Sequence, residues 1–234
     1  ITQLITQTTH QSGTNHPIMP ASSSLTPETS FTAQATALAS QATTLSALTT
    51  ALNQFDGCSL KKTASFTLDG MGISENPTVL CVIDAPKSDD EKVGHLGGGD
   101  IGLLLLKMLK AIQLDCALNT YLAPVIPWRL PGDRKPTDTE IAVCLPFLKQ
   151  RIELLQPRFL LIFGPLPAKA LLGVDSIAKA RQQELSYQTA SGKCIPVIAT
   201  FGPDSVKKGQ SYRINAWADL QKLQKMLNES LQQE

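Results

Sequence analysis

The sequence predicts an α/β fold: a three-layer α/β/α sandwich around a central, mostly parallel four-stranded sheet. Four short runs of large apolar residues recur along the chain with few polar interruptions. Stretches of helical length and helical periodicity separate these runs. Strands that are apolar on both faces and joined by helices are typical of a parallel sheet that helices cover on both sides.

The predicted strands and helices alternate along the chain. Thr137 and Glu140 form a capping-box pattern, in which each side chain accepts a hydrogen bond from the backbone N–H of the other residue, so a helix is predicted to begin there. The expected strands are residues 79–83, 121–126, 159–163 and 195–200, and the expected helices are 100–112, 137–155, 167–172 and 215–231. Sheets of this kind place their working site beyond the carboxyl ends of the strands.

The chain divides into three predicted regions. Residues 1–25 are mostly Thr, Ser, Gln, Asn and Pro, too few of them apolar to offset the entropy of ordering, so a disordered tail is expected. Residues 26–54 are rich in Ala, Leu and Thr and are predicted to form an N-terminal helix, with Ser24 or Thr26 as its cap. Residues 55–234 are long enough to form one ordinary domain.

Composition and charge exclude several classes of protein. The 21 basic and 20 acidic residues give a net charge of +1, which excludes a highly basic nucleic-acid-binding protein. Aromatic residues make up only 5%, which argues against a surface that stacks single-stranded bases. The three histidines, His10, His16 and His95, all lie in the first half. No mechanism can therefore draw a histidine from the C-terminal half.

The five cysteines argue against a disulfide framework or a zinc site. No two of them form a C-x-x-C pair, and their wide spacing suits the reduced thiols of a cytoplasmic protein. No apolar stretch approaches the roughly 20 residues of a membrane span, so no membrane partner is expected.

Six segments occur together in a fixed order, and together they carry a resemblance. They are FDGCSL (55–60), DAP followed by acidic residues (84–86), PWRLPGDRKPT (127–137), EIAVCLPFL (140–148), AKALLG (168–173) and AWADL (216–220). In this order and spacing they resemble the uracil-DNA glycosylase superfamily, in the branch of the iron–sulfur family-4 enzymes and their cluster-free relatives. The resemblance implies an α/β/α fold and the hydrolysis of a base from DNA in base excision repair.

The resemblance also implies a pocket for a flipped uracil at the strand ends. In the family an aromatic ring stacks on the base, an amide bonds its edge, a histidine stabilises the departing uracil, and a polar group of the first motif, G-E-A-P-G, helps to place water. Here that motif is IDAPK. Asp84 keeps a carboxylate about 1.5 Å shorter in reach, Ala85 and Pro86 keep the middle of the motif, and Lys87 replaces its last glycine.

The three other pocket groups are missing. Gly97 stands at the position of the stacking phenylalanine, Pro124 at that of the base-reading asparagine, and Gly202 at that of the catalytic histidine. The glycines at 97–99 could cradle a phosphate, but without a following Lys-Ser/Thr pair a turn capped by Asp100 is favoured. His95, in the same stretch, is expected to be exposed to solvent.

An iron–sulfur cluster is not expected. A cubane cluster requires close to four thiolates. Cys58 and Cys144 fall on two of the family's ligand positions, but Phe55 and Trp128 fall on the others. We therefore expect no cofactor and no bound metal, with Trp128 filling the space by apolar bulk.

Several basic residues are candidates for contact with the DNA backbone. The resemblance places the family's DNA-facing loops at 127–137 and 204–209, where the wedge that enters the duplex is reduced to Val206. The alternative for the first loop is a solvated face or ion pairing with Asp133 and Asp138. The candidates are Arg129, Arg134, Lys135, Lys207 and Lys208.

These observations lead to two expectations about function. The first is a superfamily member that is catalytically impaired or inactive, a pseudoenzyme that serves as a binding or scaffold protein for an unidentified partner and has at most weak, non-specific affinity for DNA. The alternative is an active DNA glycosylase that removes uracil or another deaminated base through a rearranged pocket in which Asp84 is the residual catalytic candidate.

Overall fold

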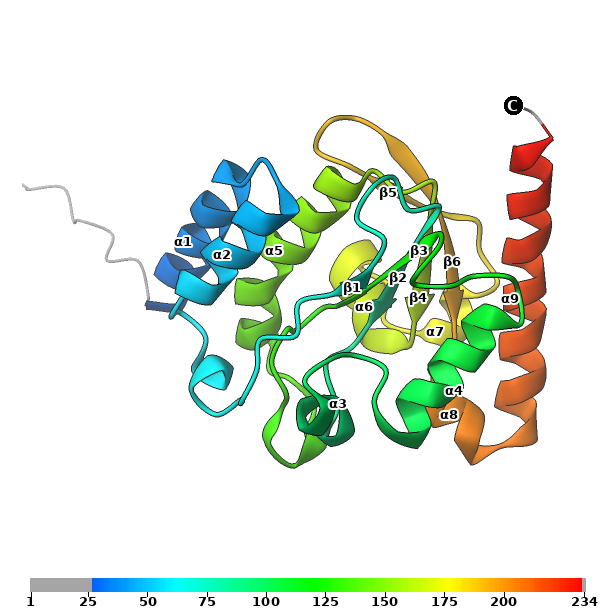
Figure 1. Cartoon of the computed structure of the whole chain (residues 1–234), viewed down its shortest axis with the longest axis horizontal. Helices are drawn as coiled ribbons and strands as arrows, with labels where there is room; N and C mark the ends of the chain where they lie inside the picture. The colour runs from blue at the N-terminus through cyan, green and yellow to red at the C-terminus, as the bar shows by residue number, and fades with distance from the viewer. Residues whose placement is uncertain (1–26, 233–234) are drawn as a thin grey trace, which may run out of the picture.

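The computed structural model describes residues 27–232 and has three layers around one sheet (Figure 1). Four central strands are parallel, as predicted: β2 (Val79–Ile83), β3 (Thr120–Pro124), β4 (Phe159–Phe163) and β6 (Cys194–Thr200). The sheet has six strands rather than four, in the order β1-β3-β2-β4-β6-β5. The added edge strands, β1 (Met71–Gly72) and β5 (Leu185–Gln188), pair antiparallel with β3 and β6. Because β1 has two residues and β5 is half exposed, neither forms an apolar run.

Alternate residues of the central strands face the two helical layers. Leu80 and Val82 of β2 face one core, while Val79 and Cys81 face the other. The first core is covered by α1 (Pro27–Gln41), α2 (Leu45–Gln54), α5 (Asp138–Leu155) and α6 (Pro165–Leu172). The second is covered by α4 (Gly99–Lys110), α8 (Pro203–Lys208) and α9 (Gln210–Leu231). Each strand is therefore buried on both sides, as its sequence predicts.

The N-terminal region forms two helices instead of the single helix expected at 26–54. The chain leaves helical geometry after Gln41, and the side chain of Thr44 accepts a hydrogen bond from the backbone N–H of Ala47 at 3.1 Å, which caps α2. Both helices pack against α5 through small and aliphatic residues that include Ala35, Ala39 and Leu48. The expected tail at 1–25 and the candidate caps Ser24 and Thr26 lie outside the described residues.

Helix starts and ends follow local signals. Thr137 and Glu140 make the predicted capping box of α5. Gly98 rather than Asp100 is the N-cap of α4, and Asp100 lies in its first turn. Several short helices lie in segments that the sequence does not predict to be helical, because a helix of only one or two turns leaves no periodic pattern. They are α3 (Ser88–Val93), α7 (Ile177–Ala180), α8 and the 3₁₀ turns η1 (Ser59–Lys62) and η2 (Pro131–Asp133). Over residues 27–232, no helix combines the length and apolarity needed to cross a membrane.

The ends of β2, β3, β4 and β6 meet at one edge of the sheet, toward the lower part of Figure 1. The loops that follow them begin at Asp84, Val125, Gly164 and Phe201. Buried polar contacts hold the end of β6 in place. Asp219 of α9 accepts hydrogen bonds from the hydroxyl of Thr200 at 2.7 Å and from the guanidinium of Arg181, whose carbon lies 4.8 Å above the ring of Phe201.

Candidate functional site

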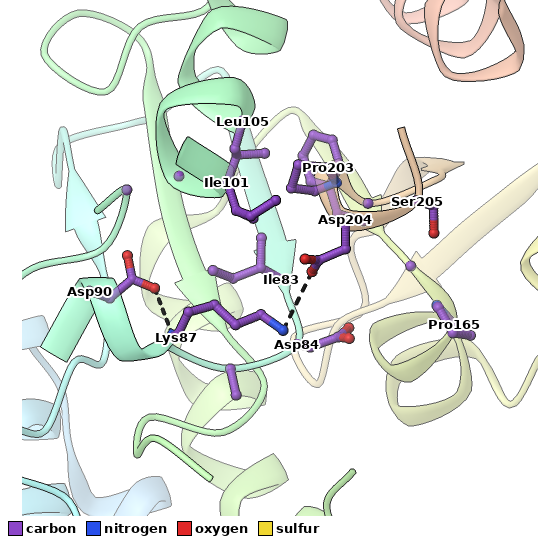
Figure 2. Close-up of a pocket in the computed structure, with 16 residues that line it drawn as sticks. Ile83, Asp84, Lys87, Asp90, Ile101, Leu105, Pro165, Pro203, Asp204 and Ser205 are labelled. Carbon is purple, nitrogen blue, oxygen red and sulfur yellow. Dashed lines mark hydrogen bonds and ion pairs between the residues drawn. The ribbon is translucent and has the colours of Figure 1, made fainter. Parts of the chain in front are cut away.

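A small cavity of about 100 Å³ lies beyond the ends of β2, β4 and β6 (Figure 2). Asp84 and Lys87 line it after β2, Gly164 after β4, and Gly202 after β6, while Leu105 closes it from α4. The strand ends that the sequence predicts to lie together therefore surround a cavity. It is smaller than the roughly 300–1,000 Å³ of ordinary ligand sites.

Asp84 is the buried carboxylate of this cavity. Its Oδ1 is buried and has no hydrogen-bond partner. Burial raises the pKa of Asp84 to about 6 from its ordinary 3.8, with Lys87 opposing the rise and Asp204 adding to it. Gly164 has a φ of +94°, and a Cβ there would stand 3.4 Å from Oδ1 of Asp84, so the backbone of β4's end approaches the carboxylate closely. Asp84 is thus poised to accept a proton or a hydrogen bond.

Lys87 reaches across the cavity and pairs with Asp204 of α8. Its Nζ lies 3.4 Å from Oδ2 of Asp204, and Figure 2 shows this pair beside Asp84. The loop itself is held by Asp90, whose carboxylate accepts the backbone N–H of Lys87 at 2.7 Å and that of Gly98 at 2.8 Å. Asp90 is buried, so this bridge fixes the loop at 84–87 against the glycine run. The ion pair therefore spans the cavity from a fixed loop.

Gly97 and Gly202 differ in whether a larger residue could replace them. Gly97 has a φ of +87°, which larger residues rarely adopt, and a Cβ there would stand 3.0 Å from Cδ1 of Leu106, so an aromatic residue would strain the backbone and press on that side chain. Gly202 is extended and has open space around its missing Cβ. His95, the one histidine among the described residues, is exposed, and its Nδ1 lies 2.8 Å from the carbonyl oxygen of Leu96. It does not line the cavity.

The remaining predicted pocket residues do not all line the same cavity. Ala85 lines the small cavity, whereas Pro124, the buried last residue of β3, does not. Pro86 faces a second cavity of about 380 Å³, which shares Asp84, Ala85 and Lys87 with the first and is bounded by Lys135 and Lys169. Sequence reasoning missed Asp90, Asp204 and Lys169. The acidic run at 89–91 was a signal for Asp90, but no local pattern pointed to the other two.

Comparison with known proteins identifies the fold. Residues 71–221 match the family model described as the uracil DNA glycosylase superfamily. The chain belongs to the uracil-DNA glycosylase superfamily. It is 28% identical over 170 residues to the type-4 uracil-DNA glycosylase of Archaeoglobus fulgidus, covering 71% of this chain and 84% of that enzyme. It is 29% identical over 174 residues to the type-4 enzyme of Pyrobaculum aerophilum, covering 70% and 85%. A DNA polymerase of Bacillus phage SP01 is 25% identical over 169 residues, which cover 72% of this chain and 18% of the polymerase.

The residues at the superfamily's cluster positions do not fit an iron–sulfur cluster. Phe55 and Trp128 are each 1% exposed, and Trp128 donates its indole N–H to the hydroxyl of Thr67 at 3.1 Å. Two large side chains thus fill this part of the core and leave the thiols of Cys58 and Cys144 as the available soft ligands. Within residues 27–232, no group of three or more His, Cys, Asp or Glu side chains is arranged to hold a metal ion.

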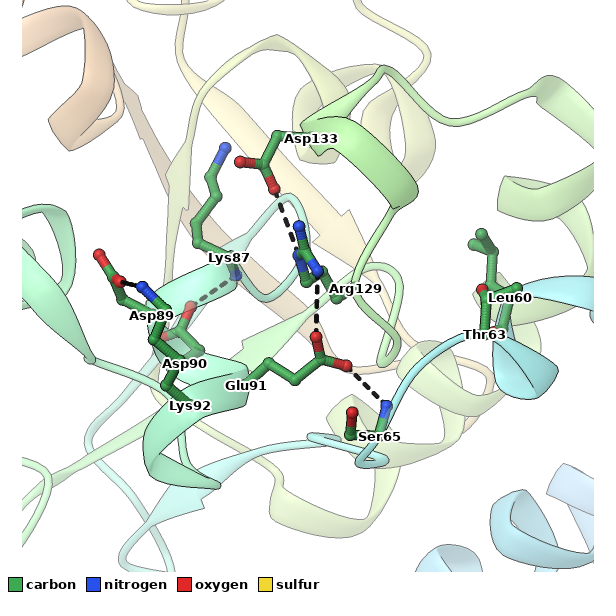
Figure 3. A network of polar contacts seen from close by, with 10 residues as sticks. All are labelled: Leu60, Thr63, Ser65, Lys87, Asp89, Asp90, Glu91, Lys92, Arg129 and Asp133. Carbon is green, nitrogen blue, oxygen red and sulfur yellow. Dashed lines mark hydrogen bonds and ion pairs between the residues drawn. The ribbon is translucent and has the colours of Figure 1, made fainter.

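Two of the three candidate DNA contacts on the loop at 127–137, Arg129 and Arg134, are engaged within the protein, and Figure 3 shows the contacts of Arg129. Arg129 pairs with Oε2 of Glu91 at 3.2 Å and lies 3.7 Å from Oδ1 of Asp133, while Glu91 also accepts the backbone N–H of Ser65 at 2.6 Å. Arg134 pairs with Glu140 instead of the expected aspartates, through two hydrogen bonds of 2.9 and 2.6 Å.

The second candidate surface is α8. Lys207 pairs with Asp100 at 3.2 Å, whereas Lys208, like Lys135 of the first loop, is exposed and makes no ion pair within the described residues. Val206 is 5% exposed and packs into the second core, so the expectation that it forms a remnant wedge is wrong. Of the five candidates, Lys135 and Lys208 are therefore the two without an ion pair among the described residues.

Proposed function

We propose that this protein is a uracil-DNA glycosylase superfamily member whose excision chemistry is lost or severely weakened, and that it acts as a binding or scaffold protein. The observation that carries the proposal is the cavity beside Asp84. Lys87 and Asp204 form an ion pair across it, and Gly97 and Gly202 supply neither a ring to stack on a base nor an imidazole to stabilise a departing one. Phe163, whose side chain also borders the cavity, is 2% exposed and packs in the second core.

The expected loss of rate is large. One preorganised donor that stabilises developing charge is worth about 10²–10³ in rate, and Gly202 supplies no side chain for that role. A base that is not held by stacking and hydrogen bonds also loses the benefit of orientation. Both losses act on the same step, so excision should fall to background.

The surface supports at most weak affinity for DNA. With Arg129, Arg134 and Lys207 already paired to carboxylates, a phosphate must compete with those partners. A net charge of +1 adds no overall attraction. We therefore place binding in the non-specific range, with a dissociation constant of about 10⁻⁴–10⁻⁶ M.

The partner that we propose is a protein that works on DNA. Support comes from the phage DNA polymerase, in which a matching segment makes up 18% of a larger protein. The exposed ends of the sheet, rather than the small cavity, would then serve recognition.

One observation favours a second candidate, an active glycosylase with a rearranged pocket. Asp84 is buried at a strand end with an unpaired Oδ1 and a pKa of about 6, and a general base works best when its pKa lies near the working pH. In that case Asp84 would activate water for attack on the sugar, and Asp84→Asn would abolish excision.

A salt titration of DNA binding tests the proposal. The wild type and Lys207→Ala/Lys208→Ala are titrated against matched duplexes with and without one uracil. Expected are weak binding that falls steeply with salt, a shallower salt dependence in the variant and no preference for uracil. A preference for uracil beyond about tenfold would mean that the pocket still reads bases.

A further inference from the structure

Lys87 carries a primary amine that borders the small cavity and is also open to solvent. Its side chain is 39% exposed, and its Nζ lies 3.4 Å from Oδ2 of Asp204, whose side chain is 49% exposed. Both residues line the cavity. An ion pair between two partly exposed side chains adds little stability, so an incoming group can displace Asp204 from the amine.

Asp84 can take up and return a proton beside this amine. It lines the same cavity, and its Oδ1 is buried without a hydrogen-bond partner (Figure 2). Burial raises the pKa of Asp84 to about 6 and the charge of Lys87 opposes that rise, so the two groups are within electrostatic reach of each other. A lysine amine forms Schiff bases with carbonyl compounds, and a neighbouring acid–base group assists the proton transfers.

The loop that carries Lys87 is fixed through its backbone. The buried carboxylate of Asp90 accepts the backbone N–H of Lys87 at 2.7 Å and that of Gly98 at 2.8 Å. Because these bonds use the main chain, the Lys87 side chain is not needed to hold the loop. A substitution at Lys87 should therefore remove the amine and leave the fold in place.

The cavity and its surroundings indicate which carbonyl compound fits. The cavity is small, and neither Gly97 nor Gly202 supplies a group that holds a base, so a sugar without a base suits it better than a nucleotide. In DNA the open-chain form of such a sugar carries an aldehyde at C1′. Lys135 borders the neighbouring cavity and Lys208 lies in α8, and both are exposed without an ion pair among the described residues, so they are open to phosphates.

We propose that Lys87 captures the C1′ aldehyde of an abasic site in DNA as a reversible Schiff base. The inference rests on the weak affinity for DNA proposed above, and it names what the binding protein would hold. The reaction that supplies this ligand is the loss of a base by cleavage of its N-glycosidic bond. Because the base is gone before the site is captured, the chain needs no excision activity of its own.

The step balances without an oxidant or a reductant. The ammonium of Lys87 gives a proton to Asp84, and the free amine attacks C1′, so that an N–C bond forms and the C=O double bond becomes single. The oxygen takes a proton from the nitrogen and becomes a hydroxyl. Asp84 then returns its proton to this hydroxyl, the C–O bond breaks, and water leaves an iminium ion between Lys87 and the sugar.

The test is reduction with sodium cyanoborohydride of the protein mixed at low salt with a duplex that carries one preformed abasic site. Hydride adds to the iminium carbon and makes a stable secondary amine, which appears as a protein–DNA species in a denaturing gel. We expect this species with the abasic duplex and not with a duplex that carries a tetrahydrofuran analogue, which has no aldehyde. Peptide mapping by mass spectrometry should place the adduct on Lys87.

Two variants test the assignment to Lys87. Lys87→Arg keeps the positive charge but has no primary amine, so it should abolish the protein–DNA species. The matched control is Lys92→Ala, because Lys92 is 71% exposed, pairs with Asp89 at 2.7 Å and does not line the cavity, and it should react as the wild type does. An adduct that persists in Lys87→Arg or maps to another lysine would overturn the proposal. Circular dichroism checks that both variants are folded.

A second arm with free 2-deoxyribose 5-phosphate and the same reductant separates the reactive amine from the affinity for DNA. We expect this sugar to label Lys87 ahead of Lys92. Equal labelling of the two lysines would refute the reactive amine, whatever the affinity for DNA. Labelling of Lys87 without a protein–DNA species would refute the abasic ligand and trace the failure to the proposed affinity for DNA.

Discussion

Replacing Asp84 by asparagine should stabilise the folded protein at neutral pH. The carboxylate is buried, and its Oδ1 receives no hydrogen bond from the protein. Burial raises its pKa to about 6 from 3.8, which means that the folded state disfavours the charged form. Asparagine has nearly the same shape and no charge, so this penalty disappears.

The size and the sign of the effect follow from the pKa. A rise of about two pKa units corresponds to about 3 kcal/mol. Because the folded pKa lies above the unfolded one, the stability that the protonated carboxyl contributes is complete below about pH 4 and is lost as the pH rises through about 6. The advantage of Asp84→Asn should therefore be small near pH 4 and grow to about 2–3 kcal/mol above pH 7.

Urea unfolding of the wild type and Asp84→Asn between pH 4 and pH 8 measures this difference. The control is Asp138→Asn, because the Asp138 side chain is 88% exposed and pairs with Lys169 at 3.1 Å. An exposed ion pair contributes less than about 1 kcal/mol, so the control should change little with pH. An advantage of Asp84→Asn that is the same at every pH, or a wild type that is more stable at pH 8, would refute the reasoning about Asp84.

Two further predictions concern the former cluster region. Protein purified without oxygen should show no iron–sulfur absorption, because Phe55 and Trp128 cannot bind iron; about four iron atoms per chain would contradict this. Trp128→Ala should lower the free energy of unfolding by about 3–5 kcal/mol, since the side chain is 1% exposed and its removal leaves a large cavity. An unchanged urea midpoint would show that Trp128 does not fill the core as described.

The sequence predicted those parts of the fold that local patterns encode. The strand at 159–163 is an uninterrupted apolar run and was predicted to the residue, and Thr137 with Glu140 located the start of α5. The edge strands β1 and β5 were missed because pairing with a neighbour, rather than apolar periodicity, makes them strands. Val206 was misplaced because its burial depends on packing within the second core.

The site could be predicted only in outline. The positions of Asp84, Gly97 and Gly202 came from motifs, but Lys87 and Asp204 are far apart in sequence, and only the meeting of strand ends brings them into an ion pair. The pairing of Arg134 with Glu140 likewise depends on how the loop folds back on the first turn of α5. Such pairings have no periodic signal in the sequence.

The most direct test of the central claim is the single-turnover rate of uracil excision from a single-stranded oligonucleotide. The protein is measured with Asp84→Asn beside it and the type-4 enzyme of Archaeoglobus fulgidus as the positive control. We predict that the wild type and Asp84→Asn both remain at background, because Gly97 and Gly202 supply neither the ring nor the imidazole that excision requires. A wild-type rate comparable with that of the type-4 enzyme, abolished by Asp84→Asn, would contradict the claim and establish an active, rearranged pocket.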